Sequence, residues 1–490
     1  MNRKQLGLLI SLSSILGGCA LFSPSYVAPQ LDAPQSLRNG SIVESSAEDF
    51  SQMAWWGKFN DLTLDNLIMR ALHNNNQLKV AQANISQAQA QLKAAQYAWI
   101  PTLNASGLGL AGNTYATNLT PQGSLSQLMP NGSVGNTNFS VWQGGFVPSY
   151  SFNVFANINQ TKLAKASLEL QTAAANATKL SIIGQVSGAY FMLLGQRKQL
   201  LLQQQTINDL TSLYQLQELK VKVGNSDNLS LTLLQQQLED ARSKLPAIEN
   251  SIAQTENALQ ILLGNNPGAI TTTRDIDDYD LQTIIPANLP SAVLKNRPDI
   301  LMAEDNLKMA NANIGLANAT FFPTISLTGN IGAASVALSN LFSIGTGFWF
   351  VQAAANMPIL NASSFEQVKA AKGGYYVAYY NYMQTVKSAF ADVDNSLTNQ
   401  DKVNQQYLAG QKSQAASWHY YQLVLAQYKI GTGNKISLLN AKLATDSALL
   451  NLNQLKMQQL ASIVQVYQSL AGGYNVAESA IPAHSANEAN

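Results

Sequence analysis

Residues 297–329 read RPDILMAEDNLKMANANIGLANATFFPTISLTG, and this stretch decides the fold. Its first part has small residues at helical spacing, which predicts a helix that begins at Ala303 and Glu304 and lies close against a neighbour. Pro323 ends this helix because its ring blocks the helical hydrogen-bond pattern. Beyond Pro323, apolar residues at 325, 327 and 331 alternate with polar ones, which predicts a strand with one apolar and one polar face.

The same order of helix, proline and strand occurs earlier in the chain, so the chain is an internal duplication. A later match, Gly224 with Gly431, has a shift of 207 rather than 222, so the second copy has lost 15 residues between the matched blocks. The loop of the first hairpin is the natural place for them. At the shift of 222, identical residues stand opposite Ala81, Asn84, Ala88, Ala90, Ala95, Pro101, Thr102 and Gly107.

Each copy is expected to hold one helix, two strands and two long helices. The first copy has a helix from Leu62 to Ala98, and the run from Asn159 to Val223 has no proline and would span roughly 100 Å as a helix. Alternating apolar residues end the second strand with Phe152 and Val154. The other predicted strands run from Thr102 to about Ala111, from Thr324 to Ala333 and from Thr346 to Met357.

The helix after the first turn carries a heptad seam, which predicts packing of the coiled-coil type with a kink at Pro246. The matching seam of the second copy is more polar, because it contains Thr445, Gln459 and Ser462. The apolar seam of the first copy consists of Leu231, Leu234, Leu238, Ala241, Leu245, Ile248, Ile252, Thr255, Leu259 and Leu262.

Glycine-containing turns join the long helices of each copy. Glycine accepts the positive φ of a helix end, so Gly224 and Gly431 are expected to end helices. Asp227 and Asn434 follow at positions where their side chains can cap the next helix. An ordinary turn is a sufficient account of both segments. The segments themselves are Val223-Gly224-Asn225-Ser226-Asp227 and Ile430-Gly431-Thr432-Gly433-Asn434.

The composition is polar but weakly charged. Only 12% of the residues are charged, whereas about 25% is usual for soluble domains. A water-filled conduit fits this composition, and so does a neutral coiled-coil protein. The formal charge of +1 becomes −1 once Arg3 and Lys4 leave with a signal peptide. No basic field that would attract nucleic acid then remains.

The N-terminus predicts a targeting signal. Arg3 and Lys4 precede an apolar run that is too short to span a bilayer, and Leu16-Gly17-Gly18-Cys19 follows. One reading is a chance cysteine near a cleavage site. The other is that Cys19, the only cysteine, resembles a bacterial lipobox cysteine, which is lipidated and becomes the new N-terminus. Ala20 in place of aspartate then favours delivery to the outer membrane.

Four strands per chain cannot close a membrane barrel alone, because lipid offers no partner to an open strand edge. If these strands span a membrane, the chain must oligomerise. Two copies would give eight strands and a barrel filled by its own side chains, whereas three or more would leave a lumen. The residues alone exclude neither three nor four copies.

The runs RPDI and FFPTISLTG, with Ala303-Glu304 between them, resemble the signature of the TolC-like outer-membrane efflux factors, in the lipoprotein branch that serves resistance-nodulation-division (RND) pumps. Trp55-Trp56 and the residues after it are similar to the N-terminal motif of that branch. The resemblance covers nearly the whole mature chain. We expect a structural role for the signature residues Arg297, Pro298, Asp299, Glu304, Pro323 and Gly329.

The resemblance implies a mostly α protein with a membrane β-barrel part. Three copies would form a 12-stranded barrel that continues into a long periplasmic α-helical coiled-coil barrel. It further implies an outer-membrane location with a lipid anchor, a periplasmic adaptor protein and an inner-membrane RND pump. The residues themselves suggest no cofactor or metal, because the histidines are isolated and no Cys/His spacing matches a metal site. The residues predict a signal peptide (1–18), a tether (19–50), a first repeat (51–264, with a hairpin at about 102–157 and a tip at about 223–228), a connecting segment (265–290), a second repeat (291–472, with a hairpin at about 324–358 and a tip at about 430–435) and a flexible tail (473–490).

Both turns resemble the periplasmic tips of the family, where adaptor hairpins dock and the channel closes. Adaptor contacts are therefore implied for Gly224, Asn225, Ser226, Gly431, Thr432 and Gly433. Better-known members carry carboxylates just past the second turn. This chain has Ser437 and Asn440 there, which puts a carboxylate gate in doubt and leaves these two residues as candidates for the constriction.

Other motifs favour structural interpretations. Gly107 to Gly112 match a dinucleotide fingerprint, but neither a helix nor an acidic residue follows at the required spacing. The acids at 275, 277, 278 and 280 could bind calcium, although a solvated loop is favoured because no EF-hand pattern is present. Arg297 and Asp299 favour a salt bridge or helix cap over catalysis. The tyrosines at 375, 376, 379, 380 and 382 fit either a membrane interface or packing between helices.

The function that we expect is an exit duct of a three-part efflux system, with passive export of small molecules. An alternative is the same architecture in type I protein secretion. A third possibility, of another class, is a non-conducting structural lipoprotein of the envelope. No histidine cluster, nucleophile elbow or Walker loop supports catalysis.

Overall fold

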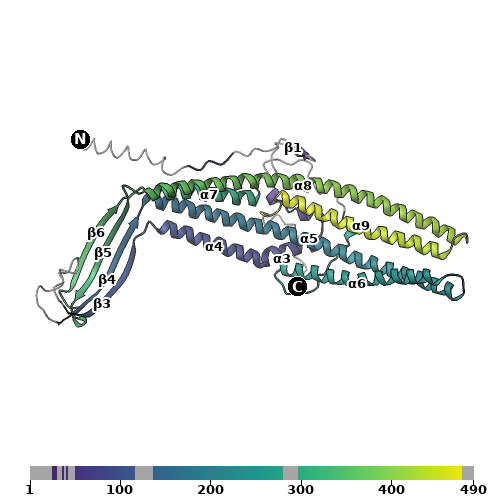
Figure 1. The fold of residues 1–490 in the computed structure, drawn as a ribbon, viewed down its shortest axis with the longest axis horizontal. Coiled ribbons are helices and arrows are strands. Elements are labelled where there is room, and N and C mark those ends of the chain that lie inside the picture. Colours follow the sequence, from purple (N-terminus) through teal and green to yellow (C-terminus); the bar gives the residue numbers. More distant parts are fainter. Residues whose placement is uncertain are drawn as a thin grey trace. The chain divides into compact units, whose positions relative to one another are not determined.

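The computed structural model describes residues 25–29, 36–37, 40–41, 50–115, 136–279 and 296–476. Figure 1 shows the main elements. Several predictions lie outside the described residues. These concern the signal peptide, Cys19, much of the tether, the loop of the first hairpin, residues 280–290 and the end of the C-terminal tail.

The first repeat begins after two short elements, β1 (Ser36–Leu37) and β2 (Gly40–Ser41), which pair with each other. The 3-10 helices η1 (Phe50–Gln52) and η2 (Trp55–Phe59) precede it. Its elements are α3 (Leu62–Asn74), α4 (Asn76–Tyr97), β3 (Thr102–Tyr115), β4 (Asn136–Phe152), α5 (Val154–Lys222) and α6 (Asn228–Leu262).

From α4 onward, the second repeat has the same order of α-helices and long strands. Adding 222 to the bounds of α4 gives the bounds of α7, and adding 207 to those of α6 gives the bounds of α9, so the duplication is confirmed. The 3-10 helix η3 (Ile276–Asp278) lies in the connection between the repeats. The elements of the second repeat are α7 (Pro298–Ala319), β5 (Thr324–Ser335), η5 (Leu338–Asn340), β6 (Gly347–Asn356), α8 (Ala362–Lys429) and α9 (Lys435–Ser469).

Several predicted boundaries were wrong, and three of them have consequences for the fold. The expected helix from Leu62 to Ala98 is two helices, because Asn75 leaves the helical conformation and its Oδ1 accepts a hydrogen bond from Gln77 N at 2.7 Å to begin α4. Val154 starts α5 rather than ending a strand. The helix expected from Ala303 begins five residues earlier, with Pro298 in the first helical position, where its missing N–H is harmless.

The four long strands form one antiparallel sheet in the order β3-β4-β5-β6, and they lie side by side in Figure 1. Gly107–Gly112, the match to the dinucleotide fingerprint, lies within β3. The first hairpin has 14 and 17 residues in its strands, whereas the second has 12 and 10. The residues lost from the second repeat therefore come from the strands as well as the loop.

The chain folds into two compact units. One unit contains the sheet, with residues 88–167 and 307–377. Within it, α7 lies against α5 at Gly315, where a Cβ atom would stand 2.2 Å from Asn159 Oδ1. Asn153 Nδ2 donates to the carbonyls of Ala319 and Phe322 at 2.9 and 3.2 Å, next to the end of α7. The prediction that this helix lies close against a neighbour is confirmed.

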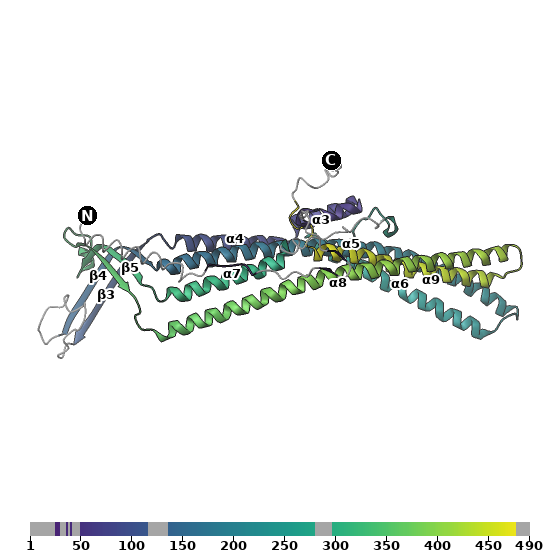
Figure 2. The same cartoon turned by 90° about the horizontal axis from the view of Figure 1, so that it is seen from above.

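The other unit contains the paired long helices, and α8 and α9 lie side by side in Figures 1 and 2. All ten residues of the predicted α6 seam are buried or half-buried. Helix α6 continues through Pro246. In α9 the polar seam residues are buried as well, and Gln459 Nε2 donates to Asn404 Oδ1 at 2.8 Å. The polar seam therefore packs through side-chain hydrogen bonds.

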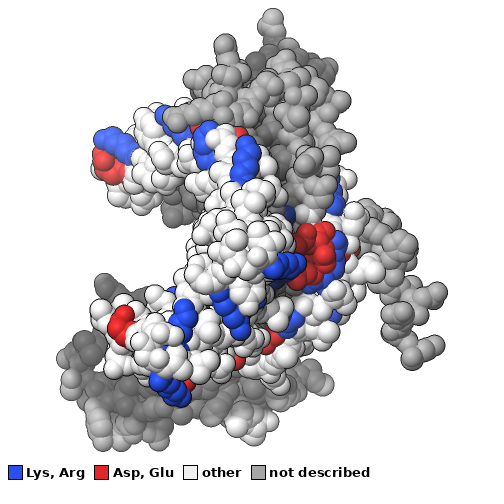
Figure 3. All heavy atoms as spheres, turned by 90° about the vertical axis from the view of Figure 1, so that its right-hand side faces the viewer, with Lys and Arg blue, Asp and Glu red and all other residues white. Residues whose placement is uncertain are grey.

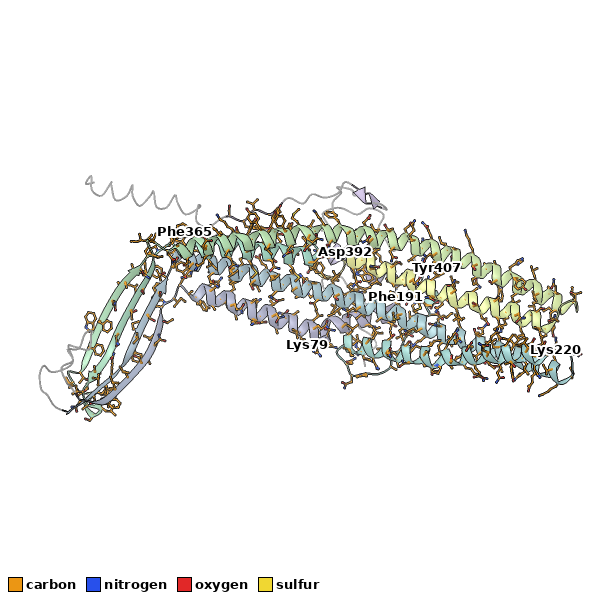
Figure 4. All side chains as sticks on the ribbon, in the orientation of Figure 1. Lys79, Phe191, Lys220, Phe365, Asp392 and Tyr407 are labelled. Carbon is orange, nitrogen blue, oxygen red and sulfur yellow. The ribbon has the colours of Figure 1, made fainter. Side chains whose placement is uncertain are left out.

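The core of this unit is built around the tryptophan pair. Trp55 stacks on Tyr467 with ring centroids 4.8 Å apart, and Trp56 packs edge-on against Trp55. Next to them, the buried Asp61 accepts hydrogen bonds from the hydroxyls of Tyr190, at 2.6 Å, and Tyr279. These residues join η2, α5, η3 and α9 into one core, in which the labelled Phe191 lies (Figure 4).

The C-terminal tail was predicted to be flexible over residues 473–490, and this is wrong for its first part. Residues 471–474 are buried. Tyr474 Oη donates to the Asn296 carbonyl at 2.7 Å, and Asn475 N donates to the Ser51 carbonyl at 2.7 Å. The segment after α9 therefore closes over the tryptophan pair, and residues 477–490 lie outside the described residues.

Truncating the stacked tryptophan should destabilise the fold. Trp55→Ala removes a fully buried ring, so we expect the unfolding free energy to fall by about 3–5 kcal/mol, measured as a lower midpoint of thermal unfolding by circular dichroism. Trp418→Ala is the control, because that ring is 48% exposed. Equal losses in both variants would contradict a core built on Trp55.

Candidate functional site

The faces of the sheet are the first candidate functional surface. On one face stand Phe146, Leu327, Ile331, Trp349 and Val351, which the strand registers bring together. Trp349 is 75% exposed, Val351 72% and Ile331 61%, which is unusual for large apolar side chains. The other face of β5 carries Thr324, Ser326, Thr328 and Asn330, so the predicted two-faced strand is confirmed. Figure 4 shows side chains on both faces.

Both edges of the sheet lack a neighbouring strand within the described chain. β3 and β6 each pair on one side only. Neither strand contains a proline or a charged residue, which are the features that natural edge strands use to prevent pairing. Their outer N–H and C=O groups are therefore available to strands of another chain.

The two turns between the long helices are the second candidate surface. In the first turn, Gly224 has φ +76° and Asp227 caps α6 by accepting from Ser230 N at 2.7 Å. In the second turn, Gly431 has φ +81° and Asn434 caps α9 by accepting from Ser437 N at 2.8 Å. Glycine tolerates this conformation and longer side chains rarely do. Both predicted caps are confirmed.

The structure places the two candidate gate residues on the first turns of α9. Ser437 is half-buried, whereas Asn440 is exposed. The turn ends carry the lysines Lys220, Lys222, Lys429 and Lys435 but no carboxylate within α9 before Asp446. Figure 3 faces the end that carries both turns, and much of its described surface is uncharged.

Two acids of the connecting segment, Asp275 and Asp277, are held by one lysine, Lys198. Lys198 Nζ lies 3.2 Å from Asp275 Oδ2 and 2.7 Å from Asp277 Oδ2, and the Asp278 side chain accepts from Asp275 N at 2.9 Å. The solvated loop expected for these residues is in part a capped 3-10 helix. Asp280 lies outside the described residues.

Arg297 has the structural role expected of it. Its guanidinium binds Asp299 through two hydrogen bonds of 3.0 and 2.8 Å and also reaches Asp392 Oδ2 at 3.1 Å. Another hydrogen bond, of 2.8 Å, goes to the Ser469 carbonyl at the end of α9. Arg297 therefore joins α7, α8 and α9.

The tyrosines near the start of α8 differ in their exposure to solvent. Tyr382 is buried, whereas Tyr376 and Tyr380 are exposed.

The described ranges hold neither a metal centre nor a membrane-spanning helix. No three His, Cys, Asp or Glu side chains of the described residues gather as metal ligands would. No described helix is both long enough and apolar enough to cross a membrane.

Comparison with known proteins accounts for this combination of sheet and paired helices. The sequence model of the family described as "Outer membrane efflux protein" matches residues 67–265 and 289–472, which is most of the chain. The chain belongs to the outer membrane efflux protein family.

Relatives of this efflux family match almost end to end. The antibiotic efflux pump outer membrane protein ArpC of Pseudomonas putida is 30% identical over 480 residues, which cover 97% of this chain and 96% of ArpC. The probable outer membrane lipoprotein SilC of Salmonella typhimurium is 29% identical, with 95% and 98% covered. The open state of the Neisseria gonorrhoeae MtrE outer membrane channel has a TM-score of 0.79 at 28% identity, with 92% and 98% covered. This chain is accordingly an outer-membrane efflux channel protein.

One polar cluster of this efflux protein was not anticipated from the sequence. Lys442 Nζ on α9 lies 2.7 Å from Asp209 Oδ1 on α5, and Gln205 Nε2 on α5 donates to Asp446 Oδ1 at 3.0 Å. Asp446 is only 1% exposed. The cluster joins one helix of each hairpin. The one feature of the sequence that could have indicated this cluster is that Lys442 and Asp446 stand four residues apart, beside the polar seam of α9.

The two carboxyl groups of this cluster affect each other. Burial, together with the hydrogen bond and the charge of Asp209, raises the pKa of Asp446 to about 7. The second carboxyl oxygens, Asp209 Oδ2 and Asp446 Oδ2, are buried and receive no other hydrogen bond from the described residues. A proton on Asp446 therefore lets it donate to Asp209 and relieves the repulsion between the carboxylates.

This raised pKa predicts a pH-dependent stability. The folded state keeps the proton on Asp446 up to about pH 7, whereas an unfolded aspartate loses it near 4. The contribution of this proton to the unfolding free energy is complete at pH values below the pKa of the unfolded aspartate, and it is lost as the pH rises to about 7. Between pH 5 and 7.5 we expect a loss on the order of 1–2 kcal/mol in the unfolding free energy, which Asp446→Asn should abolish.

The measurement is the unfolding midpoint of parent and variant at the two pH values. Burial and the charge of Asp61 also raise the pKa of Asp65, to about 6. Asp65 contributes a pH dependence of the same sign in both proteins, so the readout is the difference between the pH dependences of parent and variant. Asp240→Asn, at an exposed position of α6, is the control and should keep the parental slope. A parental slope in Asp446→Asn as well would rule out the carboxyl pair as its source.

Proposed function

We propose that three copies of this chain form the outer-membrane exit duct of a tripartite efflux pump. The observation that carries the proposal is the sheet, with two unpaired edges and a contiguous exposed apolar face. Lipid cannot satisfy open backbone groups, so the edges of one copy must pair with those of others. Three copies supply twelve strands, which is enough to enclose a lumen, whereas eight would be filled by side chains.

The helical hairpins would continue the duct into the periplasm and meet a periplasmic adaptor at their turns. The exposed residues Gly224, Asn225, Gly431 and Thr432 support such a contact, since they present backbone without large side chains. An inner-membrane RND pump would drive export through the adaptor. The chain needs no energy-coupling site of its own, because transport through the duct is passive.

A lipid on Cys19 would anchor each copy in the membrane. Cys19 lies outside the described residues, and the proposal rests on the Leu-Gly-Gly-Cys sequence that precedes a proline-containing segment. The name of the relative SilC includes the word lipoprotein, which supports it. Several acyl chains on one residue anchor stably, whereas one alone would be marginal.

The duct itself is tested by conductance. We expect purified protein to form ion-conducting pores in planar bilayers and its deletion to make cells more sensitive to toxic small molecules. A protein that gives no current would be a structural lipoprotein rather than a channel. Loss of a secreted protein without any change in drug sensitivity would instead indicate type I secretion.

The constriction is tested by restoring a charge at Asn440. If this exposed residue lines the constriction, Asn440→Asp adds three carboxylates there, which attract divalent cations. We expect millimolar Mg²⁺ to reduce the single-channel current of the variant more than that of the parent. Asn228→Asp, which adds the same charge at the exposed first turn of α6, is the control. Identical traces for parent and Asn440→Asp, with and without Mg²⁺, would remove Asn440 from the constriction.

A further inference from the structure

The strand registers show that the two hairpins are one pairing pattern used twice. In the first hairpin Ala105 pairs with Phe146, and in the second Leu327 pairs with Ala353. The first partners differ by 222 and the second partners by 207. These are the same two offsets that relate α4 to α7 and α6 to α9. The repeat therefore extends to the level of individual residue pairs in the sheet.

The joint between β4 and β5 connects the second strand of one repeat to the first strand of the next. In this joint Phe146 pairs with Ile331, and Gly144 pairs with Ala333. In a closed barrel, β6 of one copy meets β3 of the next copy. That joint also connects the second strand of a repeat to the first strand of a repeat. For each residue pair of the β4–β5 joint, adding 207 to the β4 residue and subtracting 222 from the β5 residue therefore gives the pair expected between β6 and β3.

We infer that β6 pairs with β3 of the partner subunit in the register that the β4–β5 joint prescribes. Val351 then stands opposite the partner subunit's Ala111, and Ala353 opposite the partner's Gly109. At the ends of the paired segment, Gly347 stands opposite the partner's Tyr115, and Asn356 opposite the partner's Ser106. This inference rests on the proposed trimeric duct and specifies how its subunits join.

The chemistry of the two edges agrees with this register. The face of β6 that carries Trp349 and Val351 continues onto the face of β3 that carries Leu103 and Ala111, because a slip of one residue would exchange the faces. The large Val351 and Phe350 come opposite the small residues Ala111 and Gly112 of the partner subunit. Just beyond β6, Ile359 comes to the position opposite the partner's Leu103. These side chains are 97% and 67% exposed in the single chain.

Disulfide trapping in outer-membrane vesicles tests the register. Directly opposite residues lie within the 4.4–6.8 Å Cα separation that a disulfide needs, whereas residues two positions away along the strand lie outside it or at its limit. The test protein is Val351→Cys with Ala111→Cys. The two matched controls keep Ala111→Cys and move the other cysteine by two positions on the same face, to Trp349→Cys or Ala353→Cys. Cys19 is the only native cysteine, and each single variant controls for it.

After mild oxidation, we expect Val351→Cys with Ala111→Cys to form covalent dimers and trimers at least about tenfold faster than either control. Faster cross-linking in a control would overturn the register while leaving the trimer in place. Intact trimers on native gels without any cross-link would overturn it too. Only monomers, in parent and variants alike, would overturn the proposed duct as well. Conductance of the reduced variants shows that each has folded.

Discussion

Backbone hydrogen bonding at the edges of the four-stranded sheet is the constraint on which the assembly depends. β3 and β6 each have one neighbour in the chain and carry no charge or proline that would keep another strand away. Once the apolar face of the sheet lies in lipid, water cannot reach the edge N–H and C=O groups and take the place of a strand partner. Within the described residues of one copy, these two edges have no further strand to pair with.

The repeated architecture could be predicted from the sequence because the duplication left identical residues at fixed offsets. Pro101 and Pro323 stand just before β3 and β5, and the seam of α6 is buried or half-buried where the heptad pattern placed it. The glycines and caps of the two turns were predictable for a similar reason, since positive φ and N-capping each restrict the residue type. Local chemistry was sufficient for these features.

Features that depend on distant partners were missed. The break at Asn75 is stabilised by a hydrogen bond from its Nδ2 to the Leu262 carbonyl, 187 residues away. Gly472 and Gly473 look like the start of a polar tail, yet they pack on Trp55 and Trp56 from the other end of the chain. The Asp209–Lys442–Asp446 cluster likewise arises only when α5 and α9 meet. Such pairings leave little periodic signal in the sequence.

The low charge of the chain has a counterpart in its interior. Amides and hydroxyls take positions in α9 that an ordinary coiled coil would give to leucine. Gln459 Nε2 donates to Asn404 Oδ1 at 2.8 Å, and Thr445 Oγ1 donates to the Ser417 carbonyl at 3.1 Å. Asn453 Nδ2, for example, donates to the Gly195 carbonyl on α5 at 2.9 Å. Helix contacts made through oriented polar groups fix one alignment more strictly than interchangeable apolar contacts do, since a displaced polar group loses its partner.

The unequal hairpins have a consequence for the outer surface of the cell. Pairing of β4 with β5 stops at Trp142, whereas pairing of β4 with β3 continues six residues further, to Asn136. Six residues of strand correspond to roughly 20 Å. In the proposed trimer, tall and short hairpins would alternate around the ring, so the strands at the mouth would form three raised crests separated by three notches. A phage or antibody approaching from outside would therefore meet a threefold crown rather than a level rim.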